Sequence, residues 1–188
     1  MNDQLKRLTI VAMMTCAAIV LGIIETFIPV FIPGVRLGLA NVIILIMIYE
    51  FKFYEGLAAD LIRIVVVALF RGTLLQPVFF MSLAGGMASF VVMLGFSKIK
   101  IFTAMGSSVM GSVAHASAQM VVAFIIISST AVFYYLPFII LLSLGTGILS
   151  GLVCDLYLSS SITSHFITVR EYKHKFNNKI EEIDEENI

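Results

Sequence analysis

The stretch Pro-Gly-Val-Arg-Leu-Gly-Leu-Ala-Asn at residues 33–41 lies between two long apolar segments and combines a proline, two glycines, a cation and an amide. The apolar run at residues 37–49 would span roughly 20 Å as a helix, less than the ~30 Å hydrocarbon core of a bilayer. Irregular polar backbone at membrane depth is tolerated where it is buried in protein or lines a cavity. We therefore predict a hinge at Pro33, Gly34 and Gly38 before a short apolar helix, a pattern typical of a ligand-binding or gating element.

Composition places the whole chain in a membrane. Of its 188 residues 60% are hydrophobic and 13% are charged, and the mean hydropathy is +1.03. A soluble domain is about a quarter charged. Lys+Arg and Asp+Glu both number 12, so there is no overall basic surface for nucleic acid. These values predict an integral membrane protein with no nucleic-acid partner.

The N-terminal segment has a basic start, Lys6 and Arg7, like a secretory signal peptide. Its apolar run is longer than the roughly 7–15 residues of a signal core, and no small-residue cleavage site follows it. We expect a first transmembrane helix that is retained. Cys16 and Cys154 both lie in apolar segments without zinc-site spacing, which favours small helix residues over a disulfide or a metal pair.

The apolar residues fall into six segments, each expected to form a membrane helix. The segments are residues 8–31, 37–49, 56–70, 77–96, 103–129 and 134–158. The expected fold is therefore an all-α, six-transmembrane-helix bundle whose second helix is short. One membrane domain covers residues 1–160, and residues 161–188 form a charged cytoplasmic tail.

The distribution of positive charge predicts the orientation. With a cytoplasmic start, only Arg36 and Arg71 lie outside, whereas the inner ends carry Lys6, Arg7, Lys52, Lys98, Lys100, Arg170, Lys173, Lys175 and Lys179. This asymmetry follows the positive-inside rule and places both termini in the cytoplasm. All four prolines then fall at external helix ends, where proline is tolerated.

Polar residues in the outer half of the bundle are the candidate ligand-binding residues. Glu25, Arg36, Asn41 and Arg71 cluster toward the outside, and two arginines with a glutamate beside a glycine hinge suggest a pocket for a polar or anionic small molecule. The alternative for both arginines is that they snorkel to the membrane interface.

His115 and Gln119 are four residues apart, so they share a helix face. A histidine this deep in a membrane usually marks a site, although a hydrogen-bonded structural histidine is the alternative. A haem ligand is disfavoured because the other histidines lie at or beyond the cytoplasmic end. We predict that His115 and Gln119 form the floor of the pocket.

Two further patterns have structural interpretations. Asp60 and Arg63 are spaced i,i+3, so they can pair within their helix, or Arg63 can reach across to Asp155. Small residues recur at helical spacing around residues 82–89, 108–112 and 143–151, which favours close helix packing. The alternative for these small faces is that they slide or open around a ligand.

Sequence motifs of common enzymes are missing from the chain. It has no Walker A loop, Gly-x-Ser-x-Gly, His-Glu-x-x-His or Asp-rich diphosphate motif. The aspartates are scattered at Asp3, Asp60, Asp155 and Asp184. We therefore expect a non-enzymatic protein whose transport, if any, is energised by another subunit.

Several segments together resemble one bacterial membrane family. They are residues 33–41 with Ile24-Glu25 before them, Ser-Leu-Ala-Gly-Gly-Met-Ala-Ser at 82–89, Gly-Ser-Val-Ala-His at 111–115 with Gln119, Tyr-Leu-Pro at 135–137 and Gly-Thr-Gly at 145–147. The chain resembles the Gx transporters, often labelled heptaprenyl diphosphate synthase component I, and this likeness covers nearly all of residues 8–155. The family is similar in size and layout to the substrate-binding S components of energy-coupling factor importers.

The resemblance implies a bacterial plasma-membrane protein that binds a small molecule of the vitamin, flavin or quinone class from outside. It also implies docking on a coupling subunit with paired ATPases through small residues of the first helix, here Ala12, Cys16, Ala18 and Gly22. A related member is linked with extracellular electron transfer, which gives an alternative role beside a flavin-carrying redox partner. Flavin or quinone is then the possible cofactor, and a prenyl diphosphate synthase component is the third interpretation.

Overall fold

The computed structural model describes residues 3–27, 38–99 and 102–160. These residues form six α-helices and one short 3₁₀ helix, with no strand among them. The elements are α1 (Asp3–Glu25), α2 (Asn41–Glu50), α3 (Phe53–Phe70), α4 (Pro77–Ser97), α5 (Ala104–Ile127), η1 (Thr130–Tyr135) and α6 (Leu136–Ser159). The all-helical class and the short second helix are confirmed, whereas Pro33, Gly34, Arg36 and the predicted tail lie outside the described residues.

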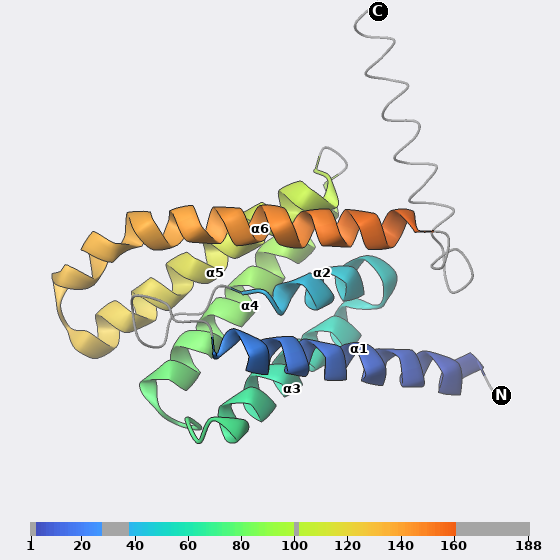
Figure 1. Ribbon diagram of the computed structural model, residues 1–188, viewed down its shortest axis with the longest axis horizontal. Helices are drawn as coiled ribbons and strands as arrows, with labels where there is room; N and C mark the ends of the chain where they lie inside the picture. Colours follow the sequence, from blue (N-terminus) through green and yellow to red (C-terminus); the bar gives the residue numbers. More distant parts are fainter. Residues whose placement is uncertain (1–2, 28–37, 100–101, 161–188) are drawn as a thin grey trace, which may run out of the picture.

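The short helix α2 is the centre of the bundle. It packs against all five other α-helices, and Figure 1 shows it between α1 and α6. Its sequence is apolar on every side from Val42 to Ile48, which is the pattern of a helix surrounded by protein. The position of α2 follows from this composition, because an apolar helix too short to cross a bilayer is stable where other helices enclose it.

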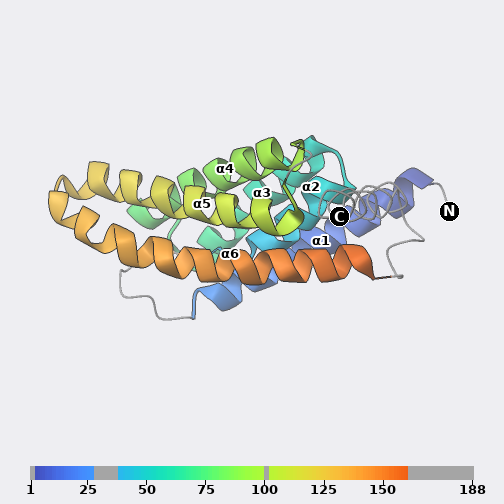
Figure 2. The same ribbon diagram turned by 90° about the horizontal axis from the view of Figure 1, so that it is seen from above.

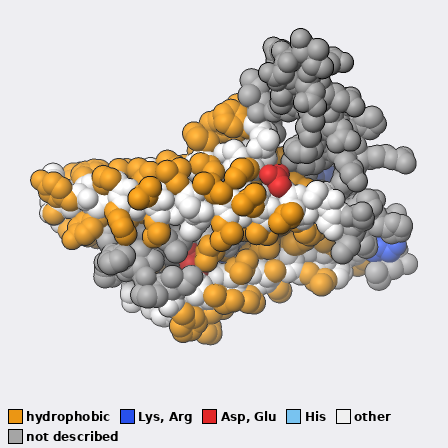
Figure 3. Space-filling view, turned by 45° about the horizontal axis from the view of Figure 1, so that its top comes forward, with side chains coloured by type: hydrophobic (Ala, Val, Ile, Leu, Met, Phe, Trp, Pro, Cys, Tyr) orange, Lys and Arg blue, Asp and Glu red, His pale blue; other side chains and the backbone are white. Residues whose placement is uncertain are grey.

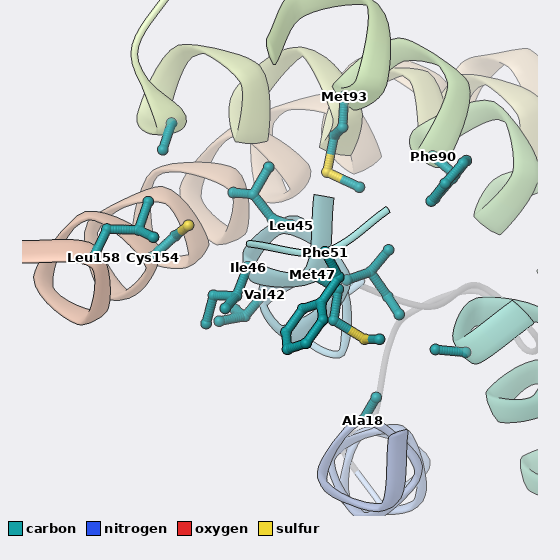
Figure 4. Packing of buried hydrophobic residues seen from close by; sticks show 13 residues of the cluster. Ala18, Val42, Leu45, Ile46, Met47, Phe51, Phe90, Met93, Cys154 and Leu158 are labelled. Atoms are coloured by element: carbon teal, nitrogen blue, oxygen red, sulfur yellow. The ribbon is translucent and has the colours of Figure 1, made fainter. Parts of the chain in front are cut away.

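Side chains from several helices close around α2 in one apolar cluster. Figure 4 shows Leu45 and Met47 of α2 among Ala18 of α1, Met93 of α4 and Cys154 of α6. All five are at most 1% exposed. The cluster fixes α2 along most of its length, so the residues at its N-terminus have a defined position relative to α1 and α4.

Four helices are long and apolar enough to cross a membrane: α1, α4, α5 and η1 with α6. Helix α3 carries Glu55, Asp60 and Arg63, and α2 has only 10 residues. The molecule is therefore a multi-pass membrane protein, and Figure 3 shows apolar side chains spread along the helices on the face that it presents. The count of six membrane spans and the cytoplasmic termini stay predictions.

Local sequence explains where the helices begin. Pro77 and Pro137 lie in the first turns of α4 and α6, where a missing N–H costs nothing. The Glu55 carboxylate accepts a hydrogen bond from Lys52 N at 2.9 Å, and Thr103 Oγ1 accepts one from Gly106 N at 3.2 Å. Each acceptor satisfies a backbone N–H that the start of a helix leaves unpaired.

The first helix ends earlier than we expected. The predicted segment runs to residue 31, but α1 ends at Glu25 and is followed by tight turns in which Thr26 N donates to Ile23 O and Phe27 N donates to Ile24 O. The reason is Pro29, which has no N–H to offer to the Glu25 carbonyl one helical turn earlier. The early ending leaves the Glu25 side chain beside the start of α2.

Helix α5 packs along α4 on one side and along α6 on the other, and these are the two most extensive helix contacts among the described residues. Figure 2 shows α5 and α6 side by side, joined through η1. A Cβ atom added to Gly151 of α6 would lie 2.5 Å from Met105 Cα, and one added to Gly147 would lie 2.9 Å from Val109 Cα. These small residues allow backbone-to-backbone contact, as the small-residue stripes predict.

Candidate functional site

The junction between α1 and α2 is organised around Gly38. Its backbone N–H donates a hydrogen bond to Glu25 Oε1, and its carbonyl accepts one from Asn41 N at 2.9 Å. Gly38 has φ +82°, a conformation that glycine adopts without strain and other residues rarely adopt. Gly38, one of the predicted hinge residues, therefore joins the end of α1 to the start of α2 through these two hydrogen bonds. Its backbone conformation is one that favours glycine.

Asn41 connects this junction to α4. Its Nδ2 donates to Ser89 Oγ at 3.0 Å, and both side chains are buried. A buried amide without a partner in an apolar environment costs several kcal/mol, so this pairing matters for the fold. Ser89 belongs to the small-residue stripe noted in the sequence, but the stripe alone did not reveal which side chain its hydroxyl meets.

His115 and Gln119 of α5 form the opposite side of the junction. Gln119 Nε2 lies 2.7 Å from His115 Nε2. Gln119 is 0% exposed and His115 is 3% exposed. An amide nitrogen only donates, so the imidazole nitrogen accepts in this arrangement. The shared helix face predicted from their spacing is present, and the direct contact between the two side chains was not predicted.

Glycines allow these groups to meet. A Cβ atom on Gly38 would lie 3.0 Å from Asn41 Nδ2 and 3.9 Å from His115 Cδ2. On the α4 side, a Cβ atom on Gly85 would lie 2.9 Å from Gln119 Cγ and 3.0 Å from His115 Cε1. Polar groups from α1, α2, α4 and α5 thus converge around two glycines. We call this set the polar junction: Glu25, Gly38, Asn41, Ser89, His115 and Gln119.

Arg71 is the described candidate that the structure places elsewhere. It follows the last residue of α3 and is exposed in the α3–α4 connection. Within the described residues, it forms no hydrogen bond or ion pair with Glu25, Asn41 or His115. Its exposure fits the alternative of an interfacial cation, and the structure does not bring it to the polar junction.

The second buried polar group is the ion pair of Asp60 and Arg63. Arg63 Nη2 lies 2.5 Å from Asp60 Oδ1, and the side chains are 7% and 1% exposed for Arg63 and Asp60. Of the two predicted arrangements, the pairing within α3 is present. Gly22 of α1 makes room for the Arg63 stem and Gly86 of α4 makes room for Asp60, so the pair lies where three helices meet.

The four candidate docking residues do not share one surface. Ala12 and Cys16 are exposed on α1. Ala18 is 0% exposed, and a Cβ atom on Gly22 would lie 3.0 Å from Val67 Cγ2 of α3. Ala18 and Gly22 therefore pack inside the chain, whereas Ala12 and Cys16 remain exposed. Docking through these residues stays a prediction.

Comparison with protein families gives one match. The sequence model of the family described as "Heptaprenyl diphosphate synthase component I" matches residues 14–157. The chain belongs to this family. The matched range includes every member of the polar junction and ends within α6. No match was found among curated proteins or among solved structures.

Packing at Gly85 provides a direct test of the polar junction. Gly85→Ala would place a methyl group 2.9–3.1 Å from His115 and Gln119, and such overpacking costs about 1–3 kcal/mol. Gly95→Ala in the same helix meets nothing within 4 Å, so helix propensity alone should make it neutral or stabilising. Denaturant titration in detergent measures both. Equal stability of the two variants would contradict the packing described.

Proposed function

We propose that this protein is the small-molecule-binding membrane subunit of an uptake system, similar in role to an S component, and that the polar junction is its binding site. The observation that carries this proposal is the convergence of five buried polar side chains from four helices around Gly38 and Gly85. Polar residues inside a membrane bundle are expensive and usually mark a ligand or ion site.

The proposed roles follow from the contacts. Glu25 and Asn41 present carboxylate and amide groups to the ligand, and His115 with Gln119 supplies the deeper contact surface. Gly38 is the point at which the chain before α2 turns, so a change in its hydrogen bond to Glu25 would alter the access to the site. The protein binds and releases its ligand without catalysing a reaction. A separate module with ATPases supplies the energy for uptake. This module docks on the side of α1 that carries Ala12 and Cys16.

Native mass spectrometry of gently purified protein tests the binding role. We expect one class of small molecule to be retained by the wild type and its occupancy to fall about tenfold or more in Gln119→Leu, because the variant leaves His115 without its amide partner. Val121→Leu is the matched control, since Val121 is 51% exposed on the same helix. Equal occupancy in Gln119→Leu and wild type would reject the polar junction as the site.

The family description favours a second candidate, a component of heptaprenyl diphosphate synthase. In that case the membrane subunit would be required for prenyl chain elongation by a partner. The two functions are separated by adding the purified protein to isoprenyl diphosphate substrates together with its partner proteins. Release of diphosphate that depends on this chain supports the synthase role. An absorbance spectrum of flavin or quinone in the purified protein would instead support the redox alternative.

A further inference from the structure

The exposed and buried faces of α3 are reversed relative to a helix at the surface of a water-soluble protein. The exposed residues between positions 56 and 70 are all apolar, namely Ala58, Leu61, Ile62, Val65, Leu69 and Phe70. The two central charges, Asp60 and Arg63, lie on the buried face. A helix at a water interface shows the opposite pattern, with its charged residues outward. The outer face of α3 therefore fits contact with lipid acyl chains.

The two charges lie near the middle of α3. The helix has 18 residues and extends about 27 Å at 1.5 Å per residue, close to the ~30 Å hydrocarbon core of a bilayer. Asp60 and Arg63 are its eighth and eleventh residues. A charge at the centre of a membrane helix opposes insertion more than one near its ends, and the costs of separate charges add. Composition alone accordingly leaves α3 out of the four helices able to cross a membrane.

Pairing of the two charges within α3 offsets this cost. Arg63 Nη2 lies 2.5 Å from Asp60 Oδ1, and the i,i+3 spacing puts both side chains on one side of the helix. Opposite charges attract strongly where the dielectric is low. The contact needs no other helix, so it is available as soon as α3 is helical. A paired α3 then has no net charge at its centre when it enters the bilayer.

The neighbouring helices enclose the pair once the chain is folded. A Cβ atom added to Gly86 of α4 would lie 3.0 Å from Asp60 Oδ2, and one added to Gly22 of α1 would lie 3.8 Å from Arg63 Cγ. Because neither position carries a side chain, α1 and α4 approach the pair closely. The Arg63 and Asp60 side chains are 7% and 1% exposed as a result, so the folded chain shields them from lipid.

We propose that the Asp60–Arg63 pair has a function in membrane insertion: by forming within α3, it allows this helix to cross the bilayer with its apolar face toward lipid. This role is independent of ligand binding at the polar junction. The sign of a single substitution separates paired from separate charges. If the charges acted separately, removing Arg63 would help α3 to insert, because one cost is lost. If they act as a pair, removing Arg63 leaves Asp60 as a lone charge and hinders insertion.

Cysteine accessibility in intact cells measures whether α3 crosses the membrane. Tyr54→Cys and Gln76→Cys, in separate full-length proteins, place a thiol near each end of α3. A membrane-impermeant maleimide labels thiols on the outside only, until the cells are permeabilised. We expect one of the two thiols to be labelled in intact cells and both after permeabilisation, above the background of the parent protein. Labelling of both in intact cells, or of neither, would contradict a crossing helix and overturn the proposal.

Charge variants of both reporter proteins test the pairing. Arg63→Met should lower the ratio of crossing to non-crossing chains about tenfold or more, and the double variant with Asp60→Ala should return it to the wild-type value or above. Gly86→Ala is the matched control, because its methyl group would lie 2.7 Å from Ile64 Cδ1 and disturb the same packing with both charges kept. Its ratio should stay that of the wild type.

Three results would overturn the proposed role in insertion. The first is a ratio in Arg63→Met that equals or exceeds that of the wild type, as separate charges would give. The second is a double variant that does not recover. The third is an equal loss in Gly86→Ala and Arg63→Met, which would mean that crossing depends on packing in the folded bundle and not on the charge of α3.

Discussion

The Arg63→Met protein is expected to lose about 3–5 kcal/mol of unfolding free energy, because the substitution leaves Asp60 as a lone charge in the bundle interior. Asp60 is 1% exposed, and Arg63 Nη2 is its hydrogen-bonded partner at 2.5 Å. Methionine keeps much of the apolar stem that packs beside Gly22, so lost packing contributes little. The result is read from denaturant titration in detergent.

A double-mutant cycle separates the charge from the packing. Asp60→Ala combined with Arg63→Met removes both charges, and the double variant should recover most of the stability that Arg63→Met loses. Replacing a buried ion pair by apolar groups is often close to neutral, whereas removing one partner is not. Additive losses in the double variant would show that the two side chains do not depend on each other and would contradict the buried pair.

The second large effect is expected at the contact between α5 and α6. Gly151→Ala would put a methyl group 2.5 Å from Met105 Cα, and that atom belongs to the backbone of α5. A flexible side chain cannot relieve this overlap, so the helices must separate along their contact. We expect a loss of about 3 kcal/mol, at the upper end of the usual overpacking cost of roughly 1–3 kcal/mol.

Gly145→Ala is the matched control for this prediction. Gly145 lies on the same helix, and a Cβ atom there meets nothing within 4 Å. Its substitution should be neutral or slightly stabilising, because alanine favours a helix more than glycine does. Both variants are compared by the same denaturant titration. A Gly151→Ala protein as stable as Gly145→Ala would mean that α5 and α6 are not packed backbone to backbone.

Sequence reasoning predicted most helices because hydrophobic length sets them directly. The predicted segments at residues 77–96 and 134–158 agree with α4 and α6 to within two residues at each end. Spacing within one helix was also informative: it placed His115 and Gln119 on one face, and it gave the Asp60–Arg63 pair as one of two possible arrangements. Helix length and the spacing of residues within a helix depend only on neighbouring residues, so a single sequence is enough to predict them.

Contacts between helices were less predictable for a physical reason. Spacing shows which residues share a face, but it does not show which neighbour that face meets. Ala18 and Gly22 therefore looked as available for docking as Ala12 and Cys16, although they pack inside the chain. The pairing of Asn41 with Ser89 was missed likewise, because it depends on α2 lying at the centre of the bundle.

The end of α1 shows how one residue changes the site. Hydrophobicity alone extends the first helix to residue 31, but Pro29 removes the N–H that would continue it, and α1 ends at Glu25. In this short form Gly38 N donates to the Glu25 carboxylate, which joins the first two helices at the polar junction.

An experimental structure of the purified protein with its retained small molecule tests the proposed site most directly. We predict density for that molecule in contact with Glu25, Asn41 and His115, with Gly38 still in its left-handed conformation beside it. Density found only against the lipid-facing side of α1 or α6, with the polar junction occupied by its own side chains alone, would contradict the proposed binding site.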